Sequence, residues 1–211
     1  MKLYYAPGAC SLATRISFHE VGRLIDFEQV DLASKLTEDG DDYTKLNPKG
    51  YVPLLILDDG QAITENVAIL SLIAERHPQV AVEGPLGRTR LLEILSYLSS
   101  EVHVAFKPLW QDIDDLQKLV AARAVEERLE LVAKQIQELY LFGPRFTVAD
   151  AYLFVMLRWA AEVGIPRSAG LIAYSERVGE RPSVRRSLAE EGLVAVPDNE
   201  DLLSIAQASV A

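Results

Sequence analysis

The chain has 211 residues and a formal net charge of −10, and hydrophobic residues make up 49% of it, which is enough for a substantial core. A chain this acidic lacks the basic footprint of a nucleic-acid groove, and its charge disfavours binding to an anionic membrane surface. The single cysteine excludes an internal disulfide, and with no basic-then-apolar leader and no bilayer-spanning apolar run the expected location is the cytoplasm.

The first 78 residues alternate strand and helix patterns. Lys2–Tyr5 is a short β-prone run that ends at a Pro-Gly pair, and SLATRISFHEVG then places Leu12 and Ile16 on one face of a helix. Further along, DFEQVDL predicts a strand, DGDDYTKLNPKG a loop around one short helix, VPLLILDDGQAITE a hairpin, and NVAILSLIAERHP a helix. The order β-α-β-α-β-β-α predicts an α/β layered domain over residues 1–78.

Residues 79–87, QVAVEGPLG, carry Gly and Pro with little periodicity and predict a linker. Residues 88–211 follow helical patterns and predict an all-helical domain. In its first helix, apolar residues at steps of four and three form a core-facing seam: Leu91, Leu95, Leu98, Val102 and Ala105. A second stripe on the same helix is polar: Ser96, Ser100, His103 and Lys107. A later seam runs from Val125 to Leu139, and Thr147 with Asp150 matches a helix capping box.

Cys10 follows the Pro-Gly turn at the predicted start of the first helix. Unpaired N–H groups at a helix N-terminus favour an anion, so we expect a lowered thiol pKa. A free cysteine is also common as a small buried hydrophobe, and both readings stay open. A dithiol redox centre is excluded because there is no second cysteine. None of the three histidines, His19, His77 and His103, has a carboxylate at metal-ligand spacing, so we expect no metal site.

Two further stretches suit a peptide ligand. In GYVPLL, a trans Pro53 simply begins a strand, whereas a cis bond turns Val52 outward to pair with an extended peptide. In TENVAIL, Thr64 or Glu65 can cap the helix that follows. The same helix end can bind an α-amino acid, with its backbone N–H groups on the carboxylate and Glu65 on the ammonium.

Taken together, these stretches resemble the bacterial beta-class glutathione transferases, which carry a cysteine in the active site. MKLYYAPGACSLATRI, NPKGYVPLLILDDG, TENVAIL and RFTVADAYLFVMLRWA stand where that family has its motifs. The resemblance implies a thioredoxin-like, glutathione-binding domain over 1–78, and an all-helical domain over 88–211 with the second-substrate site. It also implies a homodimer, glutathione as a substrate, no metal, and a hydrophobic electrophile as the second substrate.

The resemblance also implies residue roles. The catalytic residues are Cys10, beside the glutathione sulfur and able to form a mixed disulfide with it, and His103, which reaches the cleft from the helical domain. The glutathione-binding residues are Lys35 at the glycyl carboxylate, Val52 and a cis Pro53 at the cysteinyl backbone, and Glu65 and Asn66 at the γ-glutamyl group. Four hydroxyl-bearing residues are secondary candidates: Tyr5, Ser11, Ser96 and Ser100.

The chain departs from the family pattern at three positions. Asn66 stands where relatives have Ser or Gly, Val104 where many have Lys, and Ser96 where many have Asn. The expected activity is conjugation of the glutathione thiolate to electrophilic small molecules, with thiol–disulfide exchange through Cys10 as a second chemistry. Asn66 and Val104 keep one alternative open, a glutathione-transferase-like protein that binds ligands without catalysis.

Overall fold

The computed structural model describes residues 1–193, so the end of the predicted helical domain lies outside the described residues. A five-stranded mixed sheet has the order β3-β2-β1-β4-β5. β1 pairs parallel to β2 and antiparallel to β4, and the other neighbours are antiparallel. The strands are β1 (Lys2–Tyr5), β2 (Asp26–Asp31), β3 (Leu36–Thr37), β4 (Leu54–Ile56) and β5 (Ala62–Thr64).

Alternating side chains divide this sheet between two faces. Leu3 and Leu55 join the main core, together with residues of α1 (Ser11–Glu20) and α2 (Asn66–Arg76). Tyr4 and Leu54, their strand neighbours, belong to a smaller cluster on the other face. The predicted α/β layered domain is therefore confirmed, with helices packed on one face of the sheet.

The loop before β4 differs from the expected order. Its short helix is only η1, a 3₁₀ turn at Tyr43–Lys45, with the Asp42 side chain as its cap. Asn47 precedes a proline, which disfavours helical dihedrals and ends the turn. The two-residue strand β3 was not predicted, because a strand this short carries no alternation.

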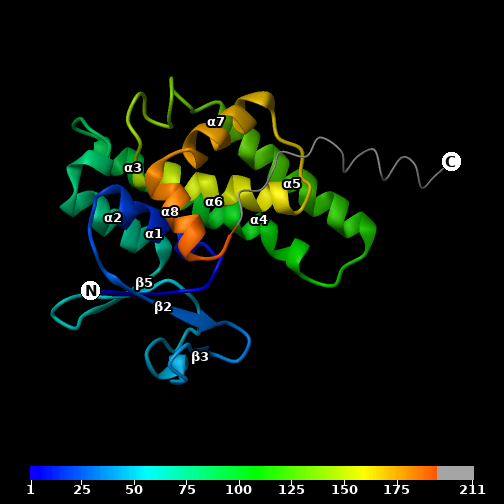
Figure 1. Cartoon of the computed structure of the whole chain (residues 1–211). Helices are drawn as coiled ribbons and strands as arrows, with labels where there is room; N and C mark the ends of the chain where they lie inside the picture. Colours follow the sequence, from blue (N-terminus) through cyan, green and yellow to red (C-terminus); the bar gives the residue numbers. More distant parts are fainter. Residues whose placement is uncertain (194–211) are drawn as a thin grey trace.

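The second half of the described chain is helical. After η2 (Pro78–Val80), a bent helix is made of α3 (Gly87–Tyr97), the π-helical segment η3 (Leu98–His103), α4 (Val104–Phe106) and η4 (Lys107–Trp110). The remaining helices are α5 (Asp115–Ala133), α6 (Val148–Glu162), α7 (Ala169–Gly179) and α8 (Pro182–Glu190). Figure 1 shows α6 running through the middle of the helical part, with the sheet along one edge. None of the described helices is long and apolar enough to cross a membrane.

One buried core joins the two parts of the molecule. It runs from Leu3 in β1 to Leu188 in α8, and α1 packs against both α6 and α8. The apolar seam predicted for the first long helix is confirmed from Leu91 to Val102, which are buried at the predicted positions, whereas Ala105 at its end is only half-buried. Helix α1 is thus packed between the sheet and the helical domain, and the two parts share one main core.

The predicted capping box at the start of α6 is confirmed. The Thr147 backbone N–H and hydroxyl both donate to Asp150 Oδ2, at 2.7 Å each. Asp150 is fully buried, and its Oδ1 accepts from Leu141 N–H at 2.9 Å and from the Tyr174 hydroxyl at 2.6 Å. One carboxylate therefore ties the start of α6 to the preceding loop and to α7.

Candidate active site

The loop between β1 and α1 carries Cys10, and the helical domain holds this loop at Gly8. The Gly8 carbonyl accepts from Trp159 Nε1 at 2.7 Å, and its N–H donates to Glu191 Oε2 at 2.9 Å. Gly8 has φ +71°, which favours glycine. Arg15 Nε lies 3.0 Å from the other Glu191 oxygen. Burial raises the pKa of Glu191 to about 7, although the Gly8 N–H and Arg15 favour its anion.

Cys10 is the half-buried N-cap residue of α1, as its position in the sequence predicts. Its Sγ donates weakly to the Val52 carbonyl oxygen, 3.6 Å away. Burial raises the pKa of the Cys10 thiol to about 12, although nearby backbone N–H groups favour the thiolate. The expectation of a lowered pKa is therefore wrong for this thiol, because the cost of burying the anion outweighs the helix terminus.

The segment before β4 faces Cys10. The Val52–Pro53 peptide bond is cis, as the resemblance implies. Lys35, with φ +61°, donates from Nζ to the Gly50 carbonyl oxygen at 3.0 Å. The sequence-predicted residues Cys10, Val52 and Pro53 are thus brought together, and Lys35 lies against the same segment.

The N-terminus of α2 holds Glu65 and Asn66. Glu65 has φ +71°, a strained value for a residue with a side chain, and such strain is concentrated at functional sites. Its exposed carboxylate accepts from Lys49 Nζ at 2.6 Å. The Asn66 side chain is buried, and its Oδ1 accepts from the Thr14 hydroxyl at 2.8 Å. The amide therefore points into the protein, and the free donors of this helix end are backbone N–H groups.

His103 closes the π-helical segment and sits among aromatic side chains. Its Nδ1 lies 3.0 Å from the Tyr152 hydroxyl, and its ring centroid lies 4.9 Å from that of Trp159. Burial, together with Lys107, lowers the pKa of His103 to about 4, so the ring is neutral near pH 7. A π-helical turn adds a residue to the helix and is frequent at functional sites.

The four secondary candidates are not placed alike. Ser11 is fully buried, and its hydroxyl contacts the Ala6 backbone. Tyr5 is buried, with its ring centroid 4.0 Å from the Arg15 guanidinium carbon. Ser96 and Ser100 are both exposed. The π-helical register instead places Ser99 beside Tyr152, and the α-helical spacing of the sequence could not reveal this.

Sequence reasoning missed three residues that shape the site: Tyr152, Trp159 and Glu191. The first two lie within the stretch RFTVADAYLFVMLRWA, whose polar and aromatic members interrupt an otherwise apolar helix. That interruption was the sequence pattern that could have identified Tyr152 and Trp159 as site residues. No sequence pattern identified Glu191, because its partners Gly8 and Arg15 are far away in the sequence.

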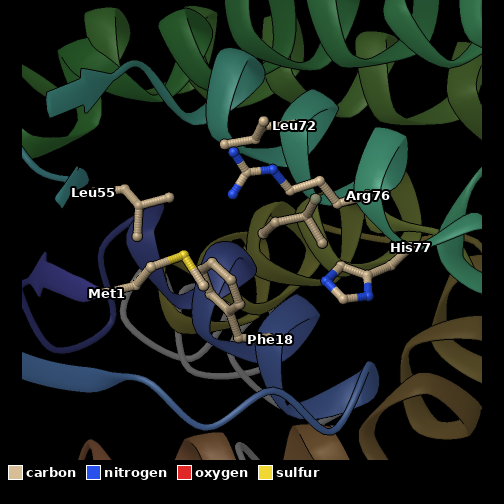
Figure 2. A pocket seen from close by; sticks show the side chains of 7 residues that line it. Met1, Phe18, Leu55, Leu72, Arg76 and His77 are labelled. Carbon is tan, nitrogen blue, oxygen red and sulfur yellow. The ribbon is translucent and has the colours of Figure 1, made fainter. Parts of the chain in front are cut away.

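A small cavity lies elsewhere in the sheet domain. Figure 2 shows its lining, which includes Phe18, Leu55, Arg76 and His77. Its volume is about 10 Å³. This cavity has room for about one water molecule, and Phe18 stands about 12 Å along α1 from Cys10. Over residues 1–193, no group of His, Cys, Asp or Glu side chains could hold a metal ion.

Comparisons with known proteins agree with this architecture. The sequence matches the family model "Glutathione S-transferase, N-terminal domain" over residues 8–76. It is 40% identical to "Glutathione S-transferase GstA" of Escherichia coli O157:H7, covering 92% of this chain and all of that protein. A beta-class glutathione S-transferase from Sphingomonas chungbukensis and a sphingomonad glutathione S-transferase complexed with glutathione each superpose with a TM-score of 0.85. They are 47% and 45% identical, and each alignment covers 92% of this chain and all of the other. This chain belongs to the glutathione S-transferase family, in its bacterial beta class.

Proposed function

We propose that the protein binds glutathione beside Cys10 and transfers its thiolate to an electrophilic carbon of a small apolar molecule. The observation that carries this proposal is the 3.6 Å contact between Cys10 Sγ and the Val52 carbonyl oxygen. That contact joins the thiol loop to the segment that suits a peptide backbone. Two relatives that each match 92% of this chain are glutathione S-transferases, so the alternative of a non-catalytic binding protein is not favoured.

The tripeptide would lie along three anchors. Val52 pairs with its cysteinyl backbone next to Pro53, and Lys35 approaches the glycyl carboxylate. Glu65 takes the γ-glutamyl ammonium in place of Lys49, its present partner. The carboxylate of the same group meets the backbone N–H groups at the start of α2. In this arrangement the glutathione sulfur lies beside Cys10.

The chemical task is to favour the glutathione thiolate. A free thiol near pKa 8.5 is only a few per cent ionised at neutral pH, and lowering its pKa by about two units takes about 2.7 kcal/mol. The N-terminus of α1 and a neutral His103 are the donors available for this. The carbon–sulfur bond forms with the electron pair of the sulfur, and the leaving group departs with its own pair.

The helical domain would bind the electrophile. We divide the chain into a glutathione-binding domain over 1–78, a linker over 79–87 and this helical domain over 88–211. Trp110 is exposed, and its ring stacks on Phe106 and meets His103 edge to face. The exposed Val104 replaces the lysine of many relatives and makes the surface more apolar. These features favour hydrophobic electrophiles, and a cytoplasmic role in removing them is part of the proposal.

Glutathione binding tests the function most directly. Glu65→Gln should weaken glutathione binding about 10- to 100-fold by isothermal titration calorimetry, because a charge-assisted hydrogen bond to the ammonium is lost. Glu75→Gln, on the exposed surface of the same helix, should leave the affinity unchanged. If the unmodified protein shows no heat of binding with millimolar glutathione, the proposed function fails.

A homodimer is also part of the proposal. The described surface of α5 exposes Leu116, Leu119 and Val120, and their apolar area is available to a second copy. Sedimentation equilibrium at micromolar concentration should give twice the chain mass of 23.4 kDa. A stable monomer would contradict this part of the proposal and leave glutathione binding untouched.

A further inference from the structure

Two pairs of buried polar side chains lie near the interface between the two domains. In the first, the Thr14 hydroxyl of α1 donates to Asn66 Oδ1 in α2 at 2.8 Å. In the second, the Tyr152 hydroxyl of α6 meets His103 Nδ1 at 3.0 Å. Thr14 is fully buried, and Asn66 and Tyr152 are 6% and 1% exposed. Buried polar groups of this kind are costly unless their hydrogen bonds are satisfied.

The direction of each hydrogen bond follows from counting protons. Asn66 Oδ1 already accepts from Thr14, so the Asn66 amide offers donors on its other side. Within the part of the chain that the structure describes, Nδ2 is buried without an acceptor at hydrogen-bond distance. Burial raises the pKa of Tyr152, and the nearby Ser99 and Asn66 side chains act in the opposite direction. Within the described residues, the hydrogen-bond partner of the Tyr152 hydroxyl is His103 Nδ1.

A phenol has only one proton to donate. Because the Tyr152 hydroxyl is buried and His103 Nδ1 lies 3.0 Å from it, that proton is directed at Nδ1. The imidazole is neutral near pH 7, so it carries one ring proton, which must then be on Nε2.

We propose that Tyr152 is a positioning residue that holds His103 in the tautomer protonated on Nε2. The consequence for catalysis rests on the proposed function. His103 then stabilises the glutathione thiolate by donating from Nε2–H, and the thiol proton leaves to solvent rather than to this ring.

The tautomer can be read by ¹⁵N NMR of histidine-labelled protein without glutathione. The chain has only three histidines, so a His103→Gln spectrum assigns the signal. We expect the Nε2–H tautomer in the unmodified protein and a mixture of tautomers in Tyr152→Phe. Tyr174→Phe is the matched control, because it removes another buried tyrosine hydroxyl, the one bonded to Asp150. Its His103 tautomer should not change.

Kinetics supply the second readout. Tyr152→Phe should lower kcat for conjugation about 10- to 100-fold while the calorimetric Kd for glutathione changes less than twofold. A proton on Nδ1 in the unmodified protein, or an unchanged tautomer in Tyr152→Phe, overturns the proposal. Because the NMR experiment needs no ligand, it decides this inference even if glutathione does not bind.

Discussion

Asp150→Ala is expected to lower the free energy of unfolding by about 4 kcal/mol, because several buried donors lose their acceptor at a cost of about 1–3 kcal/mol each. The carboxylate accepts four hydrogen bonds, and alanine leaves the donors from Thr147, Leu141 and Tyr174 buried without an acceptor. Each donor left without an acceptor destabilises the folded state, because it has lost its hydrogen bond to water and has gained none in the protein. Urea unfolding followed by circular dichroism at fixed protein concentration measures the change.

Two variants test the cause of this loss. Asp150→Asn keeps one acceptor oxygen and should fall between alanine and the native residue. Asp115→Ala removes an exposed acid from the first turn of α5, and it should change stability by less than about 1 kcal/mol. An Asp150→Ala protein as stable as Asp115→Ala would show that the buried network contributes little to the fold.

Cys10→Ser should separate the two chemistries proposed for the site. Glutathione-dependent reduction of a small disulfide should fall at least about 100-fold, because a mixed disulfide cannot form without the sulfur. Conjugation should remain within about tenfold of the native rate, since the reacting thiolate belongs to glutathione. The high pKa of Cys10 supports the expectation for conjugation, because a protonated thiol acts as a weak donor there rather than as the nucleophile. Disulfide exchange through Cys10 would proceed through the small fraction of its thiolate.

Steady-state assays with several electrophiles and one disulfide substrate measure both rates. Alkylation gives an independent check, because Cys10 is the only cysteine and no other thiol of the chain competes for iodoacetamide. In the free protein its modification should be slow at pH 7 and accelerate as the pH rises above 9. If conjugation is lost together with disulfide exchange, Cys10 is required for both and the proposed division is wrong.

The sequence predicted those parts of the fold whose signals are local. The hairpin around Asp59-Gly60 and the capping box at Thr147 each depend on a few neighbouring residues. The seam from Val125 to Leu139 predicted too long a helix, because α5 ends at Ala133 and Leu139 is exposed in the turn that follows. Periodicity identifies the face that a helix buries, but it does not mark where the helix stops.

The site was less predictable because its chemistry depends on tertiary burial. Cys10 was found at a helix N-terminus, yet its pKa is set mainly by the groups that exclude water around it. His103 was found on a polar stripe with Ser100, but in the π-helical segment it is Ser99, which is outside that stripe, that interacts with Tyr152. Only the folded chain brings Tyr152 to that position.

The Gly8 peptide, hydrogen-bonded to Trp159 on one side and to Glu191 on the other, also limits how such proteins can be recombined. A chimera that joins residues 1–78 of this chain to the helices of a relative would preserve the cysteine, the cis proline and the sheet. The loop that carries Cys10 would nevertheless be held in place only if the helices of the relative supplied an indole and a carboxylate at matching positions. The residues that must be kept together to preserve this active site therefore extend beyond the domain that contains its cysteine.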